Sequence, residues 1–518
     1  MGEFRETLLK NRTRLIVLAA LFLLFVSATQ GMAREDWLIT VLRGLSVGAV
    51  TFLVASGLSL ILGLMDVLNL AHGEMFMIGA YVGWTVYVRP DTFVDVLTPV
   101  TLVAAGLALV PLWRALLARL QLPERLQQAW PWLSLGLGLL VLFFSLRLFP
   151  LAIWDPKLYA QSPITFSLAL SQGLLTLPEP AGGGSLLLAI GGTLLGSILL
   201  GVAFAGFGSR SQRTAPQRIR WRPLLVAAAL LVLALAIYLV NTPLTQWLFG
   251  MSTTWRFFIA MAVATLTGLI LGALIEVTMI RPLYERPIYQ LMLTLGISFI
   301  GIEIVRALWG RPEFTMPKPA LFNGTGEGCP AESVGALLQN QCSTFMLFDG
   351  RVRTYNEIFV ILVGVAVLVG VWLLLQRTRI GMIIRAGVQD REMVEALGIN
   401  VRRVFTLVFA LGVALAALGG ILAAPSFGLS SDMGTRLLLL ALIALAIGGL
   451  TSFPGAAAGA VLVGLIQQFI IKYGQIGISL PFLAEPFKPS PPLVPASTVL
   501  FMVIILLILP QGLFGRSE

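Results

Sequence analysis

The sequence predicts an all-α fold: a polytopic helical membrane protein with about 14 transmembrane segments, some of them broken or re-entrant. Of its 518 residues, 57% are apolar and only 12% are charged. Globular chains carry about 25% charged residues, so this chain has too little polar material to cover a water-facing surface. The same composition excludes a disordered chain, a collagen-like repeat and a disulfide-stapled secreted domain.

Apolar runs long enough to cross a bilayer, about 20 residues, recur along the whole chain, and shorter runs suffice where their ends are buried in protein. The predicted segments are 15–29, 40–63, 73–88, 96–113, 130–150, 183–207, 223–248, 257–280, 289–309, 356–376, 405–424, 436–450, 455–472 and 496–514. The first of these is predicted to be a retained anchor within 1–37, although a cleaved signal peptide is an alternative that leaves the other segments unchanged.

The charges of the connecting loops predict which side of the membrane each loop lies on, because cytoplasmic loops are enriched in Lys and Arg. Residues 210–222 hold five arginines and no acidic residue, and the segment 377–404 is also rich in arginine. Both are predicted to be cytoplasmic. The long loop 310–355 balances four basic against four acidic residues and is predicted to be extracytoplasmic. Alternation then places both termini in the cytoplasm.

Several kinds of chemistry are excluded by counting. The chain has one histidine and two cysteines, too few for a zinc, haem or iron–sulfur site, so no metal or catalytic residue is predicted. None of its five lysines follows a glycine, so a nucleotide-binding GK[ST] loop is absent. The net charge of +10 lies in short clusters between apolar runs, which indicates membrane topology rather than nucleic-acid binding.

Two apolar stretches are interrupted by residues that a lipid-facing helix would not contain. Ionisable groups at membrane depth usually face a bundle interior or an aqueous cavity. Backbone freed by glycine or proline is tolerated only where protein or water satisfies it, and such breaks point to the central pathway of a transporter. The residues predicted to lie near a translocation pathway are Asn69, His72, Gly73, Glu74, Gly448, Gly449, Pro454 and Gly455. A membrane-edge loop with a purely structural role is the alternative.

A third segment, 385–399, is predicted to contain a short cytoplasmic helix. Asp390 is placed to cap it, and Gly398 is placed to end it. Met393, Val394 and Leu397 would then form an apolar stripe. Since the chain has no nucleotide site, a soluble ATPase docking on this stripe is one interpretation. A helix lying on the membrane or on the chain's own segments is the other.

Both cysteines, Cys329 and Cys342, fall in the predicted extracytoplasmic loop. A disulfide between them is expected if that compartment is oxidising. Two free thiols remain the alternative.

Together these segments resemble the inner-membrane permeases of branched-chain amino acid (Liv-type) ABC importers, and most closely the LivH-like ones. The residues that carry the resemblance are Gly57–Gly63, Asn69–Glu74, Ile78–Tyr81, Arg281–Leu283, Arg385–Ile399, Gly448–Ala456 and Leu509–Gly515. The likeness covers about 38–90 and 255–515, and the permease core is predicted to comprise 38–90 and 255–518. It leaves 91–254 as an additional membrane insert of about four segments.

The resemblance implies a bacterial inner-membrane subunit with no cofactor of its own. Two cytosolic ATPases that bind ATP-Mg, a second permease subunit, membrane lipid and an extracytoplasmic solute-binding protein would be its partners. The residues that the resemblance implies for ATPase coupling are Arg385, Asp390, Arg391, Met393, Glu395, Leu397, Gly398 and Ile399. Branched-chain or related neutral amino acids are the expected solutes. The alternatives are urea or amides, a proton-coupled secondary transporter that uses His72 and Glu74, or a scaffold that transports nothing.

Overall fold

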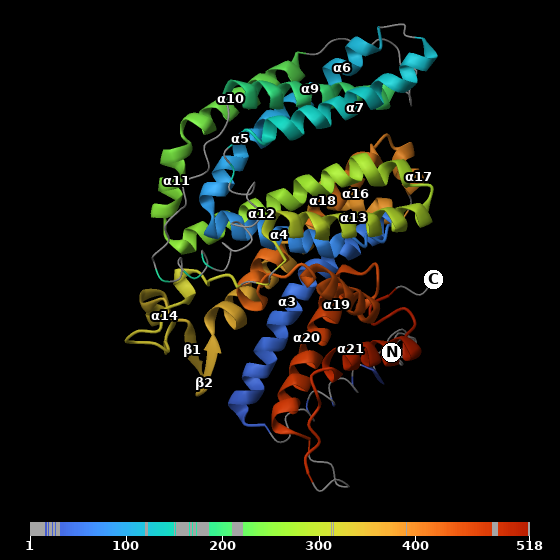
Figure 1. Ribbon diagram of the computed structural model, residues 1–518. Coiled ribbons are helices and arrows are strands. Elements are labelled where there is room, and N and C mark those ends of the chain that lie inside the picture. The colour runs from blue at the N-terminus through green and yellow to red at the C-terminus, as the bar shows by residue number, and fades with distance from the viewer. Residues whose placement is uncertain are drawn as a thin grey trace. The chain divides into compact units, whose positions relative to one another are not determined.

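The computed structural model describes residues 32–119, 123–149, 151, 186–209, 221–311, 313, 315–389, 391–478 and 485–515, together with a few single residues elsewhere. Within this part of the chain nearly all regular structure is helical (Figure 1). The chain divides into two compact units. Unit 1 comprises Met1–Trp84, Thr253–Ala307 and Arg311–Glu518, and unit 2 comprises Thr85–Ser252 with Leu308–Gly310.

Unit 1 contains most of the helices. They are α3 (Arg34–Met65), α4 (His72–Val88), α12 (Thr253–Ile275), α13 (Pro287–Trp309), α14 (Val334–Asn340), α15 (Val360–Arg377), α16 (Arg379–Gln389), α17 (Arg391–Ala396), α18 (Val401–Phe427), α19 (Met433–Gly448), α20 (Phe453–Ile476) and α21 (Leu493–Ile508). The last turns of α4 and α13 belong to unit 2. Shorter pieces are π-helical turns at Glu276–Ile280 and Thr354–Phe359 and 3-10 turns at Arg281–Leu283 and Ala320–Phe322.

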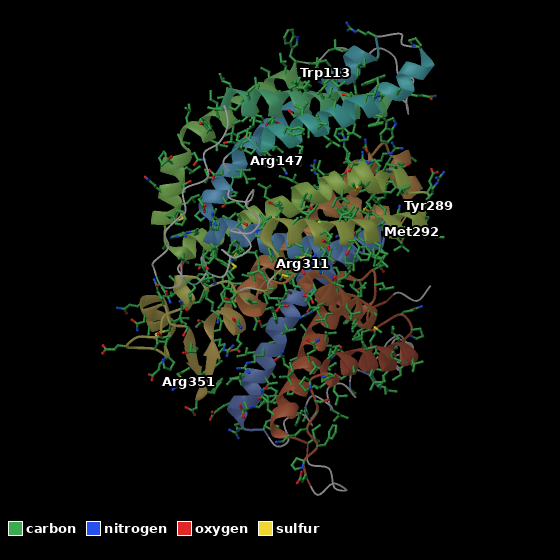
Figure 2. All side chains as sticks on the ribbon, in the orientation of Figure 1. Trp113, Arg147, Tyr289, Met292, Arg311 and Arg351 are labelled. Atoms are coloured by element: carbon green, nitrogen blue, oxygen red, sulfur yellow. A yellow bond between two sulfur atoms is a disulfide. The ribbon has the colours of Figure 1, made fainter. Side chains whose placement is uncertain are left out.

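Two helices form the interior of unit 1. In their most apolar stretches, α3 is 72% buried and α18 is 78% buried, whereas α15 is only 11% buried. A helix that is apolar on all sides must be covered by protein or by lipid. In unit 1, α3 packs against α15, α18, α19 and α20, and α12 packs along α18. The side chains of Tyr289 and Met292 project from the surface of α13 (Figure 2).

Unit 2 is a helical bundle. Its described helices are α5 (Pro90–Ala108), α6 (Val110–Leu117), α7 (Glu124–Leu146), α9 (Leu186–Ser209), α10 (Arg222–Leu239) and α11 (Asn241–Gly250). Helix α9 packs against α5, α6 and α7, and α10 packs against α5. Small hydroxyl residues face one another inside the bundle: the Thr193 hydroxyl donates to Ser145 Oγ at 3.3 Å. Small and hydroxyl-bearing residues are typical of helix contacts in membranes.

The predicted membrane segments correspond to helices wherever the chain is described. Ten helices or joined helices are long and apolar enough to cross a membrane, and α19 and α21 are shorter apolar helices. The predicted segment 73–88 is α4, with 17 residues. Most of the predicted segment 15–29 lies outside the described residues. The chain is therefore a multi-pass membrane protein, but the described part supports about ten full-length segments rather than 14.

The loop 310–355 has regular structure that the sequence did not predict. Strands β1 (Thr344–Leu347) and β2 (Gly350–Arg353) pair in an antiparallel hairpin, and Arg351 projects from β2 (Figure 2). Helix α14 precedes the hairpin, with the Ser333 hydroxyl accepting from the Ala336 amide at its start. Cys329 and Cys342 are joined by a disulfide, and their Cα atoms are 5.5 Å apart.

Candidate functional site

The first break in the sequence is a segment that turns back along α3. Helix α3 ends at Met65, and the next residue, Asp66, caps it with a left-handed backbone that has φ of 52°. After five more residues α4 begins beside the middle of α3, because His72 Nε2 lies 3.2 Å from the Val54 carbonyl oxygen. At 1.5 Å per residue, Val54 precedes the end of α3 by about 16 Å along the helix axis. The predicted re-entrant segment is thus the turn 66–71 and the start of α4.

Asn69 holds this turn in shape. Its side-chain oxygen accepts a hydrogen bond from the Ala71 amide at 3.1 Å, and its carbonyl accepts from the His72 amide at 3.2 Å. The Leu70 amide donates to the Thr294 hydroxyl of α13 at 3.3 Å. Since the backbone of a buried turn needs hydrogen-bond partners, these contacts explain why a polar Asn69 is buried here.

Glu74 links three helices. It lies on α4 and is fully buried, and its Oε1 accepts from Ser298 of α13 at 2.7 Å and from Thr435 of α19 at 3.1 Å. Within the described part of the chain its Oε2 has no hydrogen-bond partner, and neither has His72 Nδ1. The buried carboxyl group therefore fixes α4 against α13 and α19 through hydroxyl groups.

The starts of α4 and α19 meet at two glycines. A Cβ atom on Gly73 would lie 2.3 Å from the Gly434 carbonyl oxygen, and a Cβ on Gly434 would lie 2.4 Å from that of Gly73. No side chain fits at such distances. Glycine is what allows two helix backbones to approach this closely.

The second break is a tight hairpin between α19 and α20. Gly449 ends α19 with φ of 112°, and the Ser452 hydroxyl caps α20 by accepting from the Gly455 amide at 3.1 Å. Pro454 stands in the first turn of α20, where its missing amide proton is not needed. Gly448 and Gly455 are buried against each other across the hairpin.

The C-terminal segment closes this second break. The Leu513 amide donates to the Ile447 carbonyl at 2.8 Å, and the Phe514 amide donates to the Gly448 carbonyl at 2.9 Å. The last carbonyls of a helix have no partner within the helix, so these two bonds satisfy groups at the end of α19. The motif at Leu509–Gly515 and the motif at Gly448–Ala456 thus form one structural unit.

The segment 385–399 contains the end of α16 and all of α17, and the short helix predicted between Asp390 and Gly398 corresponds to α17. Val394 is buried, whereas Met393 is 58% exposed and Leu397 is 72% exposed. The three residues of the predicted apolar stripe therefore do not share one face: Val394 packs inside the protein, and Met393 and Leu397 lie on its surface. Gly398 ends this segment with φ of +79°, a conformation that favours glycine. Asp390 and the side chain of Arg391 lie outside the described residues.

The remaining residues of the predicted coupling set take different positions. Arg385 donates to the Leu375 carbonyl and, at 2.9 Å, to Gln376 Oε1, so it closes the end of α15. Glu395 is exposed on α17. Ile399 is half-buried and packs against the inner apolar residues.

One apolar cluster connects the coupling segment to the first break. Its buried members, called here the coupling cluster, are Leu64, Ile384, Val394, Val401, Phe405 and Val408. Leu64 belongs to the last turn of α3, two residues before Asp66. Ile384 and Val394 belong to α16 and α17, and the other three belong to α18. The cluster therefore packs α16 and α17 against the end of α3 and the first turns of α18.

Beside this cluster lies an ion pair that was not predicted from the sequence. Glu276 is fully buried at the end of α12, and Arg281 contacts both of its carboxylate oxygens, at 3.2 and 2.8 Å. The Thr406 hydroxyl of α18 donates to Oε2 at 2.7 Å, and the Tyr284 hydroxyl donates to Oε1. The sequence does contain a feature that indicates this pair. Glu276 is an acidic residue within the apolar run 257–280, and it lies five positions before Arg281.

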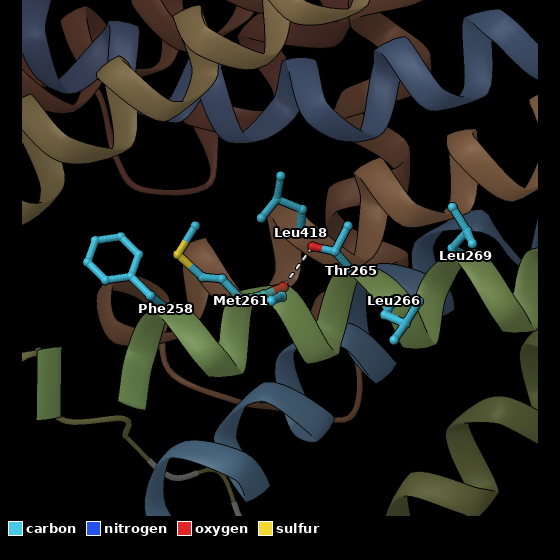
Figure 3. A pocket seen from close by; sticks show the side chains of 7 residues that line it. Phe258, Met261, Thr265, Leu266, Leu269 and Leu418 are labelled. Atoms are coloured by element: carbon cyan, nitrogen blue, oxygen red, sulfur yellow. Dashed lines mark hydrogen bonds between the residues drawn. The ribbon is translucent and has the colours of Figure 1, made fainter. Parts of the chain in front are cut away.

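Three cavities of unit 1 can be compared with the predicted pathway. The largest, of about 460 Å³, is an open groove on α12 and Leu418 of α18 (Figure 3). Its one hydroxyl, on Thr265, already donates to the Met261 carbonyl at 2.7 Å. Two smaller cavities lie among α3, α18 and α20. None of the eight break residues lines any of these three cavities.

Comparison with known proteins decides the family. The model of the family described as "Branched-chain amino acid transport system / permease component" matches residues 222–509, more than half of the chain. The chain belongs to this permease family. It is accordingly a transport subunit that lacks catalytic activity of its own, and the resemblance expected from the sequence motifs is confirmed.

Individual relatives are similar over parts of their length. The permease BraD of Pseudomonas aeruginosa is 31% identical over 173 residues, which are 33% of this chain and 51% of BraD. LivH of Salmonella typhimurium is 25% identical over 272 residues, 52% of this chain and 78% of LivH. Both are described as high-affinity branched-chain amino acid transport permeases. A fructose import permease, FruF of Bifidobacterium longum, is 35% identical over 125 residues, 22% of this chain and 34% of FruF. No solved structure matches the chain.

Proposed function

We propose that this chain is the membrane permease of an ABC importer for branched-chain or related neutral amino acids. The observation that carries the proposal is the coupling cluster, which joins an exposed apolar helix edge, Met393 and Leu397, to the end of α3 at the first break. The family and its amino-acid-transporting members support it. Because a fructose import permease is also similar to part of the chain, fructose is the competing solute to test beside leucine.

In this proposal a cytosolic ATPase docks on Met393 and Leu397. Exposed apolar side chains on a short helix beside Arg385 and Glu395 are a suitable contact for a protein partner. Movement of α17 would be passed through Val394 to Leu64 and so to the turn 66–71. The break residues, from Asn69 to Glu74 and from Gly448 to Gly455, act as a gate beside the pathway rather than as ligands of the solute. Switching between two packed arrangements is how such gates work.

The proposed orientation follows from α3. This helix has 32 residues and is about 48 Å long at 1.5 Å per residue. A Cβ on Gly350 of the hairpin would lie 3.4 Å from Ile39, near the start of α3, and the coupling cluster includes Leu64 near its end. The loop 310–355 and the coupling segment therefore lie at opposite ends of α3. We assign the loop to the extracytoplasmic side of a bacterial inner membrane, where the binding protein delivers solute, and both termini to the cytoplasm.

Residues 91–254 are proposed to be an insert within the permease core. The compactness of Thr85–Ser252 as part of unit 2 supports this division, and so do its four candidate membrane helices. An even number of crossings returns the chain to the side it left, so the core retains its orientation. A second permease subunit would complete the pathway.

The proposal is tested with the chain reconstituted in vesicles with its ATPases and binding protein. Uptake of leucine should require ATP and should persist when the proton gradient is collapsed. The double variant Met393→Asp, Leu397→Asp should lose ATPase association and ATP-driven uptake. Leu338→Asp, on the exposed face of α14, is the matched control and should retain both. Unchanged ATPase association in the double variant would refute the docking role.

A proton-coupled carrier is the second candidate. The unpaired atoms of two buried groups, His72 Nδ1 and Glu74 Oε2, favour it. Buried ionisable groups in membrane helices serve as proton relays in other transporters. In the same vesicles this candidate requires uptake that fails when the proton gradient is collapsed and that needs no ATP.

A further inference from the structure

Two of the cavities in unit 1 adjoin each other. The larger, here the apolar chamber, has a volume of about 300 Å³, and the smaller, here the polar vestibule, has about 210 Å³. Both are lined by Val47 and Val50 of α3, Phe427 at the end of α18 and Gln468 of α20. These four shared residues therefore lie between the two cavities.

The apolar chamber is walled by aliphatic and aromatic side chains. Phe76, Met433, Leu437, Leu440 and Ile471 supply most of the wall. Arg436 also lines the chamber and is paired with Asp432 at 2.5 Å. Volumes of this size, with apolar walls and a few polar groups, are typical of sites for small organic ligands.

The polar vestibule contains groups of both charges. Arg43 donates to Glu357 Oε1 at 2.9 Å, and the Arg353 amide donates to Oε2 at 2.6 Å. Glu357 is almost fully buried, whereas the Arg43 side chain is 44% exposed. The Ser426 hydroxyl, which also lines the vestibule, donates to the Asn356 side-chain oxygen at 3.1 Å.

We propose that these two compartments form a solute site for a zwitterionic amino acid with an aliphatic side chain. The charged amino and carboxylate groups are held in the polar vestibule near Arg43 and Glu357, and the side chain enters the apolar chamber past Gln468. This inference rests on the proposed function and adds to it the residues that set solute size. A lipid chain fits the site less well, since burying it would leave charged and amide groups of the walls facing hydrocarbon.

Leu440 is the residue that tests the site. Leu440→Phe enlarges a side chain of the apolar chamber and should exclude leucine more than alanine. One methylene in an apolar pocket changes discrimination by about tenfold or more, so the ratio of leucine to alanine uptake should fall about tenfold. Leu439→Phe is the matched control, because Leu439 is 54% exposed and lines neither compartment. Its uptake ratio should equal that of the wild type.

The assay uses the full chain in vesicles with its ATPases and a binding protein loaded with leucine or with alanine. Because the uptake ratios of Leu440→Phe and Leu439→Phe are measured with the same binding protein, its own preference for leucine or alanine affects both ratios equally. Retained alanine uptake shows that Leu440→Phe folds. If that variant fails to assemble, Ile471→Phe at the rim of the chamber replaces it and should lower the same ratio.

Arg43→Gln tests the polar vestibule separately. It removes the exposed cation and should raise the KM for leucine and for alanine alike, leaving their ratio unchanged. A wild-type protein that imports neither amino acid would overturn the proposed function. A wild-type protein that imports both, with the Leu440→Phe or Ile471→Phe ratio unchanged, would overturn only the solute site.

Discussion

Single residues show two ways in which unit 1 holds a buried carboxylate. Glu74 is bound by two neutral hydroxyl groups from different helices, whereas Glu276 and Glu357 are each bound by an arginine. The two hydroxyl groups fix the geometry of Glu74 without supplying a counter-charge. A buried ion pair supplies the counter-charge but becomes unfavourable as soon as one partner is removed. Glu276 and Arg281 join the end of α12 to Thr406 on α18, beside the coupling cluster.

Glu276→Gln should therefore destabilise the protein strongly. Loss of the carboxylate leaves Arg281 without its charged partner. Breaking a fully buried pair costs about 3 kcal/mol, and the Arg281 side chain is 31% exposed, so we expect a loss of about 2 kcal/mol. Glu303→Gln is a matched control, because Glu303 is 63% exposed and pairs with Arg306 on the surface of α13 at 2.8 Å. Exposed pairs of this kind contribute about 0.5 kcal/mol or less. Unfolding in detergent measures both variants, and equal losses would contradict the assigned role of Glu276.

Among the elements, the two breaks use different devices. At the first break, close contact of Gly73 and Gly434 brings the starts of α4 and α19 together. At the second, the C-terminal segment supplies two amide donors to the end of α19. A helix end whose carbonyls are bound by another segment moves together with that segment. The C-terminal segment is thus part of the second break.

Phe514→Pro tests this connection. Proline lacks the amide proton that Phe514 donates to Gly448, so a carbonyl at the end of α19 loses its partner. An unsatisfied buried acceptor costs about 1–3 kcal/mol. We expect a lower melting temperature in detergent and slower ATP-driven uptake.

Phe514→Ala is the control for this change. It keeps the amide proton, and Phe514 is 47% exposed, so removing its ring should have a small effect. Equal behaviour of the proline and alanine variants would show that the hydrogen bond to Gly448 has no role.

At the scale of the whole molecule, the helices were predictable because membrane segments depend on local composition. The turn at 66–71 could be located from its polar residues, but its path back to Val54 depends on packing against α3 and α13. The burial of Val394 beside the exposed Leu397 depends in the same way on α3 and α18. Local sequence also gave no sign of the hairpin in 310–355 or of the two adjoining cavities, which residues distant in the chain enclose.

The orientation of the molecule in the membrane gives the last prediction. Arg351 on the hairpin and Arg379 at the start of α16 are both exposed, and they lie on the segments at opposite ends of α3. The native cysteines are joined in a disulfide, so a thiol introduced at either position is the reactive one in the described chain. In intact spheroplasts, a membrane-impermeant maleimide should label Arg351→Cys and should label Arg379→Cys only after permeabilisation. The wild-type protein should remain unlabelled without a reductant. Labelling of Arg379→Cys in intact cells would reverse the proposed orientation, and ATPase docking on α17 would then be impossible because the helix would face away from the cytoplasm.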